Sequence, residues 1–339
     1  MDADHMAVRF ARSAASHAPR PATRVGAGDG WDIRTYADLH RDVRRLAARL
    51  IELGLEPGDR VAILSPNLPE WSLTDLACAS AALVSVPLYP TSTPDQIRYI
   101  LNDSGSRVLF VAGPAEAAKL AEVRADLPGL TRVVSFVPVP GDDSVTTLAD
   151  EIAAAPADDS AVDERIEAAS SADLATIIYT SGTTGEPKGV MLAHRGFAHQ
   201  VDVLNRYFDI TSFDSSLCFL PLSHSLERAW TYVLLCAGAM NTYVPDTRTV
   251  ADAMIKARPN MMVSVPRLYE KVFLTAKDKV ASSPLKQRIM SWALRTGTKF
   301  HTAERDGKPR GPLLTLSFRL ADKLVLHSVR EAMGGPKKV

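Results

Sequence analysis

The chain has 339 residues, which suffices for one large domain or two of ordinary size, and its 46% hydrophobic and 23% charged composition is typical of a folded protein. Lysine plus arginine and aspartate plus glutamate each number 39, and the isoelectric point is about 7.1. Domains that bind nucleic acid are usually far more basic, so we expect no nucleic-acid partner.

The charge is unevenly distributed along the chain. Residues 281–339 contain 12 lysines and arginines and 4 acidic residues, a net charge of +8, and the rest of the chain carries −8. A basic stretch of this kind is compatible with peripheral contact with an anionic membrane or ligand, and equally with an ordinary solvated helix face.

Neither a secretory signal nor a membrane span is expected. Charged residues interrupt the first 17 positions, and the longest uncharged runs, 76–94 and 229–245, contain prolines or a glycine and an asparagine. The three cysteines, Cys78, Cys218 and Cys236, lack the short spacing of a metal site and lie in apolar runs. Buried thiols in a reducing compartment are the simplest interpretation, so we expect a cytoplasmic protein.

The first half of the chain alternates predicted helices and strands. Thr35 and Asp38 form a capping-box pattern, and apolar residues then recur at helical spacing from Leu39 to Leu50, which predicts a helix ending near Gly54. Thr93, followed by proline and then by Gln96, predicts another capped helix that ends near residue 104. The other expected elements are strands at 60–64, 84–87, 108–111 and 133–136 and helices at 70–82, from 115, and near 147–154.

A polar segment, 156–171, is expected to be a surface connection of low order between two α/β halves, 1–155 and 172–339. Its apolar anchors are Val162 and Ile166. The alternation then resumes, with strands predicted at 175–179, 190–192, 215–220, 242–244 and 261–265, helices at 196–208, 225–238 and 249–258, and helix alone from 266, ending with an amphipathic helix at 313–333. Strands that are nearly continuously apolar and alternate with helices predict an α/β fold with mostly parallel, doubly covered sheets.

Residues 179–189, YTSGTTGEPKG, follow one of these predicted strands and have the composition of a phosphate-binding loop. Glycines allow backbone N–H groups to turn toward an anion, hydroxyl groups add neutral donors, and the lysine adds a positive charge. The spacing is not that of a Walker A loop, because Pro187 precedes Lys188 and Gly189 follows it. A plain surface turn rich in glycine and threonine is the alternative.

This segment resembles the nucleotide-binding signature of the AMP-forming (adenylate-forming) superfamily, which includes acyl-CoA synthetases, firefly luciferase and the adenylation domains of peptide synthetases. The resemblance implies the layered αβαβα large domain of that fold. It also implies that ATP phosphates are held by the loop, with Thr184 close to Mg²⁺ and Lys188 acting in catalysis. The residues that it assigns to ATP are Thr180, Ser181, Gly182, Thr183, Thr184, Gly185 and Lys188.

Two further segments are similar to long-chain fatty acyl-CoA synthetases: LPLSHSLER at 220–228 and SVPRLYEK at 264–271. This similarity implies a long-chain fatty acid as substrate and coenzyme A as co-substrate. It assigns His224 to catalysis and to the pocket near the acyl carboxylate, and Glu227, Arg228 and Trp230 to the substrate. By residue type alone, His224 and Trp230 could also be ordinary core residues.

In such enzymes the fatty carboxylate attacks the α-phosphorus of ATP, pyrophosphate leaves, and the thiol of coenzyme A then displaces AMP. The family carries later motifs that are not found here: the chain has no Thr-Glu dipeptide, and Thr296-Gly297 is followed by Thr298. The expectation is therefore the amino-terminal portion of a synthetase, an incomplete large domain without the carboxy-terminal domain. A nucleotide- or acyl-binding module without ligase activity, and an adenylating enzyme for another carboxylic acid, remain alternatives.

Overall fold

The computed structural model describes residues 1–180 and 186–338, and its internal contacts divide the chain into two compact units, Met1–Thr247 and Arg248–Val339. Among the described residues, no helix is both long and apolar enough to cross a bilayer.

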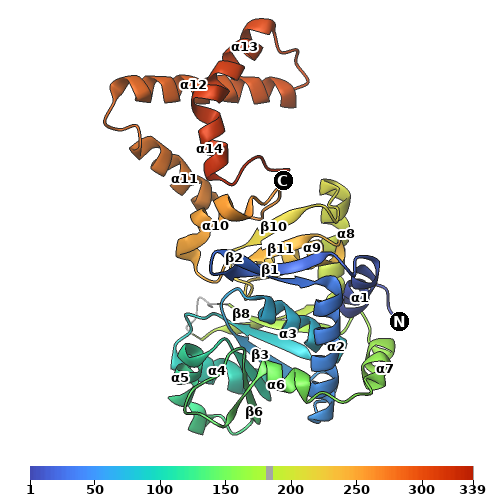
Figure 1. Cartoon of the computed structure of the whole chain (residues 1–339). Coiled ribbons are helices and arrows are strands. Elements are labelled where there is room, and N and C mark those ends of the chain that lie inside the picture. Colours follow the sequence, from blue (N-terminus) through green and yellow to red (C-terminus); the bar gives the residue numbers. More distant parts are fainter. Residues whose placement is uncertain (181–185, 339) are drawn as a thin grey trace. The chain divides into compact units, whose positions relative to one another are not determined.

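The first unit contains a seven-stranded sheet (Figure 1). In spatial order its strands are β7 (Val145–Thr147), β6 (Arg132–Ser135), β5 (Val108–Val111), β3 (Arg60–Leu64), β4 (Val84–Leu88), β8 (Leu174–Thr180) and β9 (Lys188–Ala193). All neighbouring strands are parallel except β8 and β9, which form an antiparallel pair at one edge. The predicted mostly parallel sheet is confirmed.

A second sheet of four strands lies in the same unit, in the order β10 (Ser215–Cys218), β11 (Met240–Tyr243), β1 (Pro21–Ala27) and β2 (Gly30–Thr35). Strands β10, β11 and β1 are parallel, whereas β1 and β2 form an antiparallel hairpin. We did not expect this hairpin, because much of β2 is polar and exposed and lacks an alternating apolar pattern. The hairpin turn contains Gly28 at φ +53°, a conformation that glycine adopts without strain.

Helices cover both sheets of the first unit. They are α1 (Met6–Ser16), α2 (Tyr36–Glu52), α3 (Pro69–Ser80), α4 (Pro94–Ser104), α5 (Pro114–Ala121), the short η1 (Arg124–Asp126), α6 (Leu148–Ala153), α7 (Ser160–Ala168), α8 (His194–Phe208) and α9 (Ser225–Cys236). Thr35, Thr93 and Thr147 each form a capping box at the start of α2, α4 and α6. The predicted alternation of helix and strand is therefore confirmed in outline.

Two expectations were wrong. The segment 156–171 is not of low order: it contains α7, because Val162 and Ile166 lie one helical turn apart and both are buried. Residues 261–265 form no strand within the described part of the chain. In addition, the two sequence halves are interleaved, since β8 and β9 extend the sheet of the first half and β1 pairs with β11 of the second.

The apolar core lies on both faces of the seven-stranded sheet. On one face, Leu64 and Leu88 pack with Ile97, Leu101 and Leu120 of the covering helices. On the other face, Ile63 of β3 and Trp71 of α3 pack against Cys218 and Tyr243 of the four-stranded sheet. Helix α3 is thus enclosed between the two sheets, and all of its residues except Glu70 are buried.

The second unit is helical, as predicted. It contains η2 (Thr247–Thr249, at the junction of the units), α10 (Val250–Ala257), α11 (Pro266–Asp278), α12 (Pro284–Arg305), α13 (Pro312–Ala321), the π-helical turn η3 (Asp322–Leu326) and α14 (His327–Ala332). Phe300 of α12 stacks on Phe318 of α13 with 3.9 Å between ring centres. A Cβ at Gly297 would lie 3.1 Å from a terminal methyl group of Leu326, so α12 and η3 pack closely at this glycine.

The capping box of α2 gives a first prediction. The Thr35 hydroxyl donates to Asp38 over 2.6 Å and accepts the Asp38 backbone N–H over 3.1 Å. Thr35→Ala removes this cap and is expected to lower the free energy of unfolding by about 1 kcal/mol, as measured by urea denaturation. Thr35→Ser retains the hydroxyl and is the matched control. Equal stability of the alanine and serine variants would contradict the assignment.

Candidate functional site

The predicted phosphate loop connects two paired strands. Thr180, the last residue of β8, lies opposite Lys188, the first residue of β9, in the antiparallel register. Strands β8 and β9 are thus paired up to this position, at one edge of the sheet. Both Thr180 and Lys188 are exposed, and we call the place where these two residues pair the hairpin mouth. Ser181, Gly182, Thr183, Thr184 and Gly185 lie outside the described residues.

The base of this hairpin is packed tightly. Gly189 faces Tyr179 across the strands, and a Cβ at this glycine would lie 2.7 Å from Ile177 Cγ2 and 3.2 Å from the Tyr179 ring. The Tyr179 hydroxyl donates to Asp103 Oδ2 over 2.5 Å, and Tyr99 packs edge-on against its ring. Burial, together with the Asp103 carboxylate, raises the pKa of Tyr179, so the hydroxyl remains a donor at neutral pH. These contacts fix the backbone from which Lys188 projects.

Lys188 is one of very few lysines in the first 250 residues. Lys119 and Lys188 are the only lysines among the first 250 residues, where arginine is otherwise used. The Lys119 ammonium group donates to the carbonyl of Pro90 over 2.6 Å. A lysine ammonium is a compact point charge suited to a phosphate oxygen, whereas arginine favours flat two-point contacts.

His224 is the N-cap residue of α9. Its Nδ1 accepts the backbone N–H of Leu226 over 3.2 Å, and its ring is exposed. A neutral imidazole that accepts at Nδ1 carries its proton on Nε2, so His224 can offer an N–H to a neighbouring oxygen atom.

An apolar cavity of about 410 Å³ begins next to His224. Its walls come from the end of β9, the first turns of α8 and the first turns of α9. The lining residues are Leu192, Ala193, Gly196, Phe197, Gln200, Ser225, Leu226 and Ala229. Strand β9 thus starts at the phosphate-loop hairpin and ends in the cavity wall. Most ligand pockets are apolar in this way, with a few polar groups at the rim.

Arg228, expected to contact the substrate, is buried between α3, α9 and the seven-stranded sheet. Its guanidinium donates to Asp75 of α3, at 2.5 and 3.0 Å, and to the Ser85 hydroxyl of β4 at 2.7 Å. Only 1% of Arg228 is exposed. Burial alone would lower the pKa of Arg228, but the Asp75 carboxylate and Tyr232 outweigh it and raise the pKa, so the guanidinium stays charged.

This ion pair also reaches the apolar cavity. The Arg228 guanidinium carbon lies 5.3 Å from the centre of the Phe197 ring and 5.5 Å from that of Trp71. Phe197 lines the cavity and Arg228 does not, so the guanidinium packs against a residue of the cavity wall without lining the cavity itself. The Tyr232 hydroxyl completes the cluster by donating to Asp75 over 2.5 Å.

Glu227 and Trp230 are also buried. One carboxyl oxygen of Glu227 accepts the backbone N–H of Leu220 over 3.1 Å, and the other has no hydrogen-bond partner among the described residues. Burial raises the pKa of Glu227 from its ordinary 4.5 to about 8, although the backbone N–H of Leu220 lowers it in part. Trp230 Nε1 donates to Ser216 Oγ over 2.9 Å.

Of the four residues expected to contact the substrate, only His224 is therefore exposed. We had not singled out Asp75 and Phe197. The sequence carried a signal for Asp75, because it is a lone acidic residue in an otherwise apolar or small stretch, 71–80, and such a position calls for a buried partner. No comparable signal distinguishes Phe197 from a core residue.

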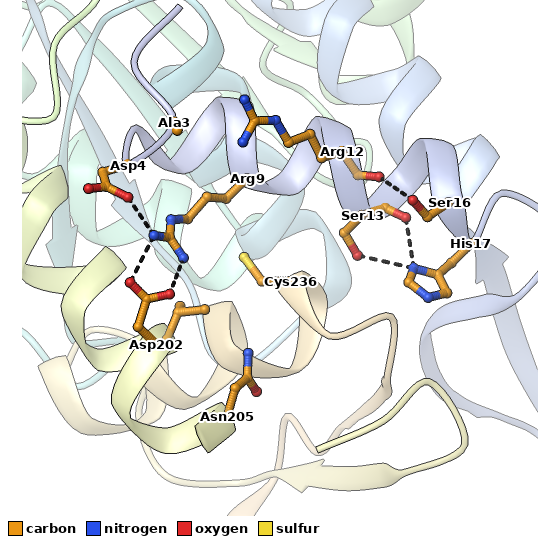
Figure 2. Close-up of a pocket in the computed structure, with 11 residues that line it drawn as sticks. Ala3, Asp4, Arg9, Arg12, Ser13, Ser16, His17, Asp202, Asn205 and Cys236 are labelled. Carbon is orange, nitrogen blue, oxygen red and sulfur yellow. Dashed lines mark hydrogen bonds and ion pairs between the residues drawn. The ribbon is translucent and has the colours of Figure 1, made fainter. Parts of the chain in front are cut away.

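A second cavity, of about 390 Å³, lies beside α1, α8 and α9 (Figure 2). There the Arg9 guanidinium is held between Asp4 and Asp202, at 2.5 and 2.6 Å. The ion pair between Arg9 and Asp202 connects α1 to α8. Cys236 at its wall has a pKa raised by burial, so its thiol stays protonated at neutral pH. The described residues contain no cluster of three or more histidine, cysteine or acidic side chains suited to a metal.

The fold and the hairpin define the class of protein: solved structures with this arrangement are amino-terminal domains of adenylate-forming enzymes. The N-terminal domain of FACL13 from Mycobacterium tuberculosis superposes with a TM-score of 0.67 at 27% identity, covering 79% of this chain and 64% of that one. ATP-bound MatB from Rhodopseudomonas palustris superposes with a TM-score of 0.64 at 29% identity, covering 80% and 51%.

Residues 10–316 match the family model described as AMP-binding enzyme, and the chain belongs to this family. It is 34% identical over 307 residues to the long-chain-fatty-acid–CoA ligase FadD15 of Mycobacterium tuberculosis, a match that covers 90% of this chain and 50% of the relative. It is 26% identical to the human ligase ACSBG2, covering 93% and 48%. The chain thus spans about half the length of the curated relatives it matches.

The buried ion pair gives a second prediction. Arg228→Met leaves the Asp75 carboxylate buried without its partner and is expected to destabilise the protein by about 3–5 kcal/mol in chemical denaturation. The double variant Asp75→Leu/Arg228→Met is expected to lose less than the sum of the two single changes. Arg41→Met, which removes an exposed guanidinium paired with Asp38 and Asp42, is the control and is expected to cost less than about 1 kcal/mol. A single variant as stable as this control would refute the role of the pair.

Glu227 gives a third prediction, on pH dependence. Its pKa is higher in the folded than in the unfolded chain, so the native state holds the proton between pH 4.5 and about 8. The stability contributed by Glu227 is fully present below pH 4.5 and is lost as the pH rises through 8. Compared with Glu227→Gln, the parent chain is expected to lose a few kcal/mol more on going from pH 5 to pH 8. Glu122→Gln, at an exposed position, should leave the profile unchanged, and parallel profiles for the parent and Glu227→Gln would rule out the shift.

Proposed function

We propose that this chain is the nucleotide- and acyl-binding part of a long-chain fatty acid–CoA ligase. It takes part in converting a fatty acid and ATP into acyl-AMP and pyrophosphate, and then into acyl-CoA and AMP. The observation that carries the proposal is the hairpin in which the sequence TSGTTGEPK begins at Thr180 and ends at Lys188, its partner across the strands. The 34% identity to FadD15 supports the long-chain substrate class.

The residues at the hairpin mouth fit the phosphate end of ATP. Thr180 offers a hydroxyl group and Lys188 an exposed cation, and both project from strands fixed by the contacts of Tyr179 and Gly189. Lys188 would stabilise the charge that develops on the departing pyrophosphate, and such preorganised charge is a major source of catalysis. The proposed nucleotide contacts of Ser181, Gly182, Thr183, Thr184 and Gly185 complete the loop.

Bound Mg²⁺ would neutralise phosphate charge, and Thr184 is the residue of this chain that we assign to it. A hydroxyl group is a hard oxygen ligand of the kind Mg²⁺ takes, usually together with water and phosphate oxygens.

We assign the fatty acid to the apolar cavity between α8 and α9. His224 directly precedes Ser225 of the lining and would offer an Nε2–H group to the acyl carboxylate or to the α-phosphate, and Phe197 and Leu226 provide apolar walls. For Arg228 we propose a positioning role through Phe197 and the start of α9 rather than direct contact with substrate. Glu227 would act in the same indirect way by fixing Leu220 in the turn before α9, and Trp230 by holding α9 to Ser216 of β10. Coenzyme A would enter in the second step, and we assign no residue to it.

A binding module without ligase activity is the second candidate. Calorimetric titration with ATP and Mg²⁺, combined with palmitate-dependent exchange between ATP and pyrophosphate, distinguishes the two. Exchange supports the ligase part and excludes the module. Binding without exchange is expected of a folded but incomplete synthetase as well as of the module, and absence of ATP binding contradicts the assignment of the nucleotide to this chain.

Lys188 provides the fourth prediction. Lys188→Ala removes the cation at the hairpin mouth and is expected to weaken ATP binding by about 10- to 100-fold, the range for hydrogen bonds to charged groups. Lys188→Arg should recover part of the loss. Arg45→Ala, an exposed cation on α2, is the control and should bind ATP as the parent does. Unchanged ATP affinity in Lys188→Ala would contradict the assignment of the hairpin.

A further inference from the structure

The second unit exposes a row of leucines along one helix face. Leu313, Leu316 and Leu320 of α13 and Leu324 of η3 are 81%, 66%, 51% and 53% exposed, respectively. Their spacing of three, four and four residues places them on one face of a continuous helical segment. The opposite face is covered, since Phe318 stacks on Phe300 and Ala321 is fully buried. We call these four residues the leucine stripe.

Basic residues flank the leucine stripe. Arg319 and Lys323 each lie three residues after a stripe leucine, both are exposed, and neither forms an ion pair within the part of the chain that the structure describes. Long basic side chains beside an apolar stripe can extend along it and keep their charges at the water boundary. Exposed leucines with basic flanks are the pattern of helices that lie in a membrane surface.

The charge around the stripe favours an anionic partner. From residue 281 onward the chain has only four acidic side chains, Glu304, Asp306, Asp322 and Glu331. Each is already in an ion pair with a nearby basic side chain of the same unit. The excess positive charge of this region is therefore left to act outward. Lysine is also concentrated here, with ten of the twelve lysines after residue 250.

We propose that the leucine stripe, with Arg319 and Lys323, docks this unit on the surface of an anionic lipid bilayer. The bilayer supplies both features that the face lacks: an apolar interior for the leucines and negative headgroups for the flanking cations. A second copy of the chain would bring two like-charged faces together, which is unfavourable. The proposal is independent of the adenylation chemistry, because it concerns lipid binding alone.

The test is flotation of the 339-residue chain with vesicles of phosphatidylcholine alone and of equal parts phosphatidylcholine and phosphatidylglycerol. We expect binding to the mixed vesicles that weakens as salt rises, and at least tenfold less binding to phosphatidylcholine alone. Arg319→Gln/Lys323→Gln should lower the partition coefficient by about fivefold for each charge removed. Leu316→Ser/Leu320→Ser should lower it by at least tenfold.

Arg45→Gln and Val203→Ser, exposed positions of the first unit, are the matched controls and should bind vesicles as the parent does. Circular dichroism and thermal melting check that the stripe variants fold. Equal binding of the parent and both double variants would overturn the proposal, as would equal binding to the two kinds of vesicle. A parent chain that forms dimers and does not bind lipid, with dimerisation lost in Leu316→Ser/Leu320→Ser, would also overturn it, because the stripe would then join two copies.

Discussion

The buried ion pair between Asp75 and Arg228 is the interaction on which the arrangement of the first unit depends. It joins α3, which is enclosed between the two sheets, to α9, and the Ser85 bond extends it to β4. The Thr176 hydroxyl donates to the Ser85 backbone carbonyl over 2.7 Å, so the same cluster reaches β8. A buried charge is tolerated only when it is paired and hydrogen-bonded, so the two helices and two strands must meet in one way.

This constraint sets the relation between the two parts of the candidate site. Strand β8 leads to the hairpin mouth with Thr180 and Lys188, and α9 begins at His224 beside the apolar cavity. Both elements are attached to the same polar cluster, and Phe197 of the cavity wall packs against its guanidinium. The elements that carry the exposed residues Lys188 and His224 are thus held by the buried cluster of Asp75 and Arg228. Arg228 illustrates the difference, since a family motif can mark a residue that supports a site from within the core.

Much of the fold follows from local sequence signals. The ranges of β3 and β5 agree with the predicted strands, and the helices capped by Thr35 and Thr93 start where the capping pattern places them. The signals were weakest where an element depends on distant partners. Strand β2 is exposed and polar, so only its pairing with β1 defines it. Helix α7 is held by two apolar residues whose burial depends on neighbouring elements. The loop and His224 are candidates that the sequence supplies, and their roles stay predictions. The burial of Glu227, Arg228 and Trp230 could not be predicted, because residue type does not reveal on which side of a helix the core lies.

The scarcity of lysine in the first unit also has a practical consequence for chemical labelling. Apart from the amino terminus, an amine-directed reagent has two side-chain targets in that unit, Lys119 and Lys188. Lys119 is half-buried and donates to the carbonyl of Pro90, while Lys188 is exposed at the start of β9. Replacing Lys119 by arginine would leave Lys188 as the sole side-chain amine of the whole first unit. Within the first unit, an amine-directed probe would then report on the candidate nucleotide site alone, while the ten lysines of the second unit would be labelled as well.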